Sequence, residues 1–82
     1  MNESLIPLNR IGIGETVKIK VLLTTGAMRR RLQDIGLTNG AYVKCLLKSP
    51  SLDPAAFLIR GAVIAIRSED SSQILTERVL SA

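Results

Sequence analysis

The sequence has no histidine and only one cysteine, Cys45, among its 82 residues. Histidine is the commonest general base and metal ligand, so the chemistry that depends on it is excluded. A single thiol cannot close an internal disulfide, and it cannot build a soft metal site alone. The carboxylates are scattered, and no serine lies in a GxSxG setting. We therefore expect a protein that is not an enzyme and that has no catalytic residues, no cofactor and no metal site.

Aromatic residues are almost absent as well, since Tyr42 and Phe57 are the only two. Val, Ile, Leu and Ala must therefore fill the core. A groove for proline-rich peptides needs clustered aromatic side chains, and so does a platform on which nucleic-acid bases stack. Two isolated aromatic residues argue against both kinds of site.

The sequence also lacks a long hydrophobic run. The segment MNESLIPLNR does not show a basic stretch followed by an apolar one, as a signal peptide would. The longest apolar runs are far shorter than the ~20 residues of a membrane-spanning helix. Cys45 lies in the apolar run AYVKCLL, where we expect it to be buried rather than reactive, and a lone cysteine fits a reducing compartment. We therefore expect a soluble, cytoplasmic protein.

The residues that are present alternate in a way that is typical of short β-strands. A chain of this length fits one domain, residues 1–82. In the segment TVKIKVLL, apolar Val17, Ile19 and Val21 alternate with polar residues, the period of a half-buried strand. The pattern predicts a mainly β fold: a small barrel of about five strands, with one helix inserted after the first strand and a short helical turn before the last. The expected strands are residues 16–23, 41–48, 56–60, 62–67 and 74–79, and the turn begins at Ser68.

In the second strand, alternation predicts that one set of side chains faces the core. This set contains Ala41, Val43, Cys45 and Leu47.

The inserted helix has an apolar stripe and a defined end. Met28, Leu32 and Ile35 recur at helical spacing and are expected to face inward. Gly36 is placed to adopt a left-handed conformation just past the helix, and Leu37 would then complete a Schellman ending. At the start, either Thr24 or Thr25 is expected to cap the helix through its hydroxyl.

The same helix carries three adjacent cations, Arg29, Arg30 and Arg31, near its beginning. Helix starts favour acidic residues, so these arginines oppose a local rule, and such conflicts are often functional. Lys18 and Lys20 would enlarge the basic patch if the outward face of their strand lay beside the helix. The patch is either a solvated face, a docking surface for an acidic protein, or a set of phosphate contacts. The formal net charge of +4 is compatible with anionic partners without selecting one.

The ordered set of motifs resembles the FeoA family of bacterial ferrous iron uptake. The resemblance spans residues 5–77, and its most specific part is Arg31-Leu32 followed by Gly36-Leu37 and Gly40. This chain departs from the family pattern at Asn39, Ala62 and Ile66. The motifs that carry the resemblance are GETVKI, RRRLQDIGLTNGAYV, LDP and RGAVIAIRSEDSSQI.

The resemblance implies a single SH3-like β-barrel domain and a non-catalytic accessory role. The implied partner is the membrane GTPase permease FeoB, which would recruit the protein to the inner face of the cell membrane without membrane insertion. From the charge pattern, and not from the resemblance, the expected partner-binding residues are Arg29, Arg30, Arg31, Lys18 and Lys20. The second hypothesis is that the protein is a small basic barrel that binds nucleic acid. The sequence leaves open the oligomeric state and whether transport is stimulated or restrained.

Overall fold

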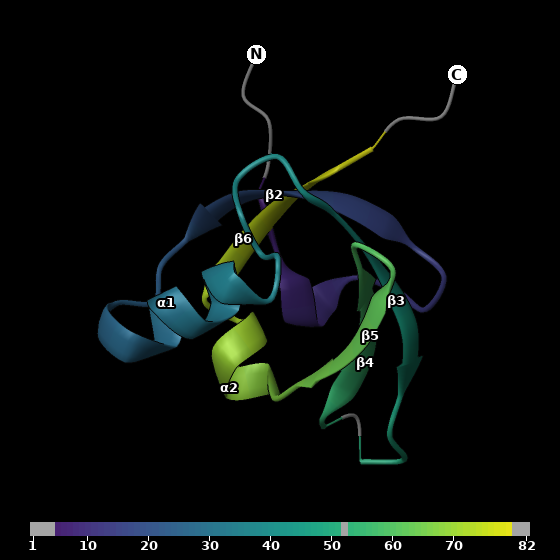
Figure 1. Ribbon diagram of the computed structural model, residues 1–82. Coiled ribbons are helices and arrows are strands. Elements are labelled where there is room, and N and C mark those ends of the chain that lie inside the picture. The colour runs from purple at the N-terminus through teal and green to yellow at the C-terminus, as the bar shows by residue number, and fades with distance from the viewer. Residues whose placement is uncertain (1–4, 52, 80–82) are drawn as a thin grey trace.

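The computed structural model describes residues 5–51 and 53–79, which form one antiparallel sheet with two short α-helices (Figure 1). The strand order across the sheet is β1-β6-β2-β3-β4-β5. The five strands expected from the sequence correspond to β2 to β6, and the very short β1 is an addition. The elements are β1 (Ile6–Pro7), the 3-10 helix η1 (Leu8–Arg10), β2 (Thr16–Leu22), α1 (Gly26–Asp34), β3 (Tyr42–Lys48), β4 (Ala55–Ile59), β5 (Ala62–Ile66), α2 (Ser68–Ser71) and β6 (Ile74–Arg78).

The sheet curls around a small aliphatic core. In Figure 1, β2 arches across the top of the view, β3 to β5 lie on the right, and η1 lies inside the curve. Leu8 of η1 and Ile11 are fully buried, so this segment fills the centre of the curl. Phe57 is the one aromatic side chain in the core of the described residues. The expected mainly β, barrel-like fold is therefore confirmed, although the sheet remains open between β1 and β5 in the described part of the chain.

Strand β3 contains an irregularity that reverses one side chain. Cys45 pairs with Phe57, but the next pairing joins Leu47 to Ala56, so the register shifts between them. Ala41, Val43 and Cys45 are buried as expected, whereas Leu47 is 57% exposed. The expectation for Leu47 was wrong because an extra residue in a strand moves every later side chain to the other face.

Helix α1 ends as the sequence predicts. The Leu37 amide donates to the Leu32 carbonyl at 2.9 Å, and the Gly36 amide donates to the Gln33 carbonyl at 3.1 Å. Gly36 has a φ of +109°, and Leu37 is fully buried. These two bonds define a Schellman ending, so this prediction is confirmed.

The beginning of α1 differs from the expectation. Thr25 is the N-cap residue, but its side chain makes no capping hydrogen bond. The hydroxyl of Thr24 is buried and has no partner within the described residues. The chain enters the helix through Gly26, whose φ is +64°. The predicted hydroxyl cap was therefore wrong, and the cations of this helix follow a start that no side chain caps.

The short helix α2 is fixed by a residue distant in sequence. Asp53 accepts hydrogen bonds from the Ser68 amide at 2.8 Å and from the Ser68 hydroxyl at 3.1 Å. A carboxylate in this position satisfies a free amide of the first turn and complements the helix dipole. Asp53 thus connects the loop before β4 to the segment that leaves β5. None of the helices in the described ranges is long and apolar enough to cross a membrane.

Candidate functional site

An open groove of about 480 Å³ lies where α1 faces the end of β5 and the start of α2. Its position follows from the chain path, because β5 leads directly into α2. Leu32 forms part of its floor and is only 4% exposed, whereas Met28 and Ile35 are half-buried and line its side. The predicted inward stripe is therefore buried at its centre and open at its ends. The lining is an apolar set (Met28, Leu32, Ile35, Ile64, Ala65 and Ile66) with a charged rim (Arg31, Arg67, Glu69 and Asp70).

The three adjacent arginines have three different surroundings. The Arg29 guanidinium donates a hydrogen bond to the Leu22 carbonyl at 2.7 Å, which ties α1 to the end of β2. Arg30 is exposed and makes no hydrogen bond or ion pair with another described residue. Arg31 lines the groove. Successive helical residues are about 100° apart around the axis, so three neighbours must point in three directions.

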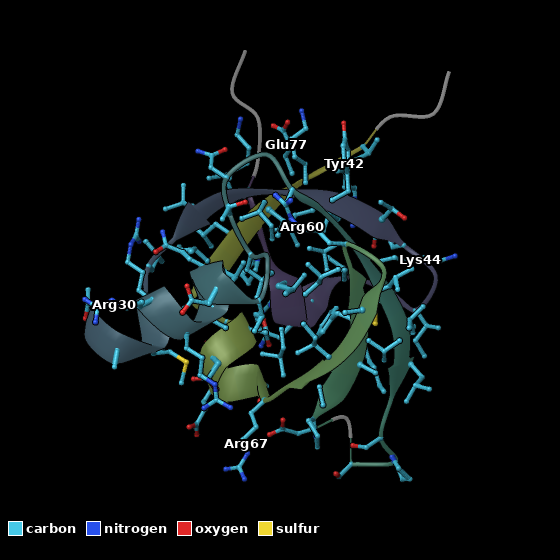
Figure 2. The ribbon with its side chains drawn as sticks, viewed as in Figure 1. Arg30, Tyr42, Lys44, Arg60, Arg67 and Glu77 are labelled. Carbon is cyan, nitrogen blue, oxygen red and sulfur yellow. The ribbon has the colours of Figure 1, made fainter. Side chains whose placement is uncertain are left out.

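The two lysines of β2 lie away from these arginines. The Lys18 ammonium sits 5.7 Å from the centre of the Tyr42 ring, a cation–π arrangement. The Lys20 ammonium lies 3.9 Å from a Glu77 carboxylate oxygen. In Figure 2, Tyr42 and Glu77 lie at the top of the view and Arg30 lies at its left edge. The structure therefore does not bring Lys18 and Lys20 together with the helical arginines into one patch.

Several residues near the groove were not singled out from the sequence. Arg67, Glu69 and Asp70 contribute its rim. Arg60 has a φ of +50°, and its side chain lies over the turn after α1, donating to the Thr38 hydroxyl at 3.3 Å. One available signal was the motif RGAVIAIRSED, an uncharged strand between charged ends. Its proximity to α1 depends on how the sheet curls, which alternation alone does not predict.

Two ionisable groups have shifted pKa values outside the groove. The pKa of the Glu15 carboxyl is lowered by the Gly12 amide, which donates to it at 2.9 Å, and by the Arg78 guanidinium at 2.7 Å. Burial raises the pKa of the Cys45 thiol. Cys45 is completely inaccessible, so the expectation of a buried small residue is confirmed. Among residues 5–51 and 53–79, no three His, Cys, Asp or Glu side chains gather so that they could hold a metal ion.

Comparison with solved structures first gives the class of domain. FeoA from Stenotrophomonas maltophilia, described as a prokaryotic SH3 domain protein complexed with zinc, superposes with a TM-score of 0.79. The two chains are 17% identical, and the match covers 88% of this chain and 89% of the other, so it shows the fold. The expected SH3-like class is therefore confirmed.

The family assignment rests on a match to a family model and is accompanied by solved structures of higher sequence identity. The FeoA domain model matches residues 6–78, and the chain therefore belongs to the FeoA family. A FeoA-like protein from Clostridium acetobutylicum is 29% identical, with a TM-score of 0.86, over 100% of this chain and 94% of the other. FeoA from Chlorobium tepidum is 27% identical, with a TM-score of 0.87, over 92% of this chain and 71% of the other. No curated protein matches the sequence significantly.

Proposed function

We propose that this protein is a non-catalytic accessory factor of bacterial ferrous iron uptake that docks on the cytoplasmic side of the permease FeoB. The proposal is supported first by membership of the FeoA family. A related structure, 26% identical to this chain, is named iron(II) transport protein A from Clostridium thermocellum. In this role the protein acts by binding, and the transport chemistry belongs to the permease.

The assignment of the docking surface rests on two cations of α1 that have no ion-pair partner among the described residues. Arg30 and Arg31 are exposed, and neither forms an ion pair with another described residue. The sequence suggested that these cations lie near the helix start, but Arg30 is the fifth of the nine residues of α1 and Arg31 lies in its last turn, where the helix dipole favours a cation. Their charges are therefore compatible with the helix and remain available for contact with an acidic face of a partner. We assign these two residues to the docking surface.

The proposal can be tested by co-purification with FeoB in membranes, comparing the wild type with an Arg30→Ala/Arg31→Ala variant. Arg29 is left intact because its hydrogen bond to the Leu22 carbonyl supports the fold. We expect the wild type to be retained and the variant to lose at least about tenfold in affinity, because two charge-assisted contacts are removed. Binding of the wild type should weaken as salt is added, since exposed charges are screened.

The matched control is an Arg10→Ala/Lys44→Ala variant, which removes the same charge from exposed positions on η1 and β3. In Figure 2, Lys44 lies on the opposite side of the view from Arg30. Equal retention of the two double variants would refute the assignment of the surface to α1. Failure of the folded wild-type protein to bind FeoB in any nucleotide or iron condition would refute the function itself.

A further inference from the structure

Strand β5 lies at one edge of the sheet and lacks the features that normally protect an edge. Its sequence, Ala62–Ile66, contains no charged residue and no proline. It pairs with β4 on one side only. Val63 is 65% exposed, and Ala62 and Ala65 are exposed beside it. Soluble proteins usually place lysine, proline or a bulge on such an edge, because its backbone can pair with another strand.

The backbone groups available on this edge follow from the hairpin register. The β4–β5 connection is Arg60–Gly61, and both residues have positive φ, +50° and +82°, as in a type I′ turn. Ile59 and Ala62 close that turn and form a hydrogen-bonded pair. Bonded and non-bonded pairs alternate along an antiparallel ladder. The amide and carbonyl groups of Val63 and Ala65 therefore point away from β4, and no backbone bond outside the sheet ladder involves either residue in the described chain.

We propose that a second copy of this chain pairs with this edge, β5 running antiparallel to β5 about a two-fold axis at Ile64. In this register Val63 of each copy faces Ala65 of the other. The two amides and two carbonyls of each edge then form four hydrogen bonds between the copies. The Ile64 side chains face each other at the axis. Such an interface is self-complementary, as a two-fold axis requires.

The side chains of β5 fit this pairing on both faces of the strand. Ile64 is half-buried and lines the groove with Met28 and Ile35. Because paired residues point to the same face, Ile64 of the second copy would project toward that groove and cover its apolar wall. On the other face, Val63 lies beside Leu58. Both faces of the strand would therefore bury apolar surface that the single chain leaves accessible.

The charges at the two ends of β5 also complement each other. Arg60 precedes the strand, whereas Glu69 and Asp70 follow it at the start of α2. The two-fold register places Arg60 level with Ser68 of the second copy, next to these carboxylates. None of the three residues forms an ion pair in the described parts of a single chain. The Arg60 guanidinium has only an uncharged partner within the chain, the Thr38 hydroxyl at 3.3 Å, and pairing would bring opposite charges near it at both ends of the interface. This favours a second copy over an unrelated uncharged strand.

Sedimentation velocity over a wide concentration range tests the pairing with the isolated full chain, without FeoB. We expect the wild type to convert from monomer to dimer as its concentration rises. An Ala65→Pro variant removes an amide that points away from β4, so the β4–β5 ladder remains. It should weaken association about tenfold or more, because each dimer loses two hydrogen bonds. Val63→Lys should weaken association comparably by placing like charges at the interface.

The control is Ile13→Lys, which adds the same charge at a site of similar exposure, 63% against 65% for Val63. It should dimerise like the wild type, and circular dichroism should show that all variants are folded. A wild type that stays monomeric at every concentration would overturn the proposal. So would a dimer that Ala65→Pro and Val63→Lys leave unchanged. Slow exchange of the Val63 and Ala65 amides in the monomer would also overturn it, because the edge would then be covered from within the chain. These outcomes are measured on the isolated chain and with variants of β5 alone, so they are read separately from FeoB binding, even though Arg31 lines the groove that the second copy would cover.

Discussion

At the scale of single residues, Arg29 and Arg30 differ although they are adjacent and chemically identical. Arg29 donates to the carbonyl of Leu22, the last residue of β2. Arg30 projects into solvent without a partner among the described residues. The first side chain therefore contributes to stability, and the second is available for binding.

This difference predicts unequal effects of alanine substitution. Arg29→Ala should lower the free energy of unfolding by about 1 kcal/mol, because a partly buried carbonyl loses its donor. Arg30→Ala should change it by less than about 0.5 kcal/mol, as is usual for exposed positions. Urea denaturation of both variants measures the two values. Equal losses would show that the Arg29 bond contributes nothing.

The sequence identified these arginines as unusual but did not separate their roles. The difference between their roles depends on which backbone carbonyl lies beside the helix, and that is determined by the tertiary structure. The same limit affected Lys18 and Lys20, whose side chains interact with Tyr42 and Glu77 across neighbouring strands. Residue types indicated where charge is concentrated, and strand pairing determined which charges are already satisfied.

At the scale of elements, the end of α1 is the most constrained junction described. A Cβ atom on Gly36 would lie 3.0 Å from Arg60 Cδ and 3.1 Å from Ile59 Cγ2. The left-handed φ and the close approach of the β4–β5 hairpin therefore both require glycine. At Gly40, φ is +92° but nothing lies within 4 Å of the same Cβ position.

The pair of glycines allows the two requirements to be separated. Gly40→Ala should cost about 1–2 kcal/mol, the penalty of a left-handed conformation alone. Gly36→Ala should cost about 2–4 kcal/mol, because overpacking against Ile59 and Arg60 is added. Thermal and urea unfolding of both variants provide the measurement. A Gly36→Ala variant no less stable than Gly40→Ala would mean that the hairpin moves aside without cost.

Elements were predictable from the sequence where local rules determine them. The Gly36–Leu37 ending follows from backbone chemistry and was predicted correctly. The exposure of Leu47 was not, because nothing in the alternating pattern marks the irregular residue in β3. The alternation of apolar and polar residues could not predict that β5 lies at the edge, because strand order depends on how the whole sheet assembles. The candidate groove was missed for the same reason.

At the scale of the whole molecule, contacts between sequence-distant residues hold the curled sheet together. The buried Thr76 hydroxyl donates to the Ile6 carbonyl at 2.7 Å, linking β6 to β1. Glu15 accepts from Arg78 at 2.7 Å and so joins the start of β2 to the end of β6. The second contact includes a carboxylate with a lowered pKa, so it depends on pH.

Acid should therefore weaken the fold partly through Glu15. Its pKa is lower in the folded state than in the unfolded state, so its contribution is complete above the ordinary glutamate pKa of about 4.3. That contribution is lost as pH falls from there through the folded-state pKa. A Glu15→Gln variant should be less stable than the wild type at neutral pH, and the difference should shrink on acidification. Urea midpoints measured across this range test it.

The control is Asp34→Asn, which removes an exposed carboxylate that has no hydrogen bond or ion pair among the described side chains. If Glu15→Gln and the wild type lost stability in parallel on acidification, the contact with Arg78 would not be responsible for the acid sensitivity.

The position of β6 has a consequence for synthesis of the protein on the ribosome. This strand is the last of the six described strands in chain order, yet it lies inside the sheet, between β1 and β2. A nascent chain that has reached only Gln73 can form the β2–β3–β4–β5 meander, but β1 and the β6-facing edge of β2 then have no strand to pair with. The growing chain therefore has an unfilled position in its sheet until β6 has left the ribosome, and only that strand can close it.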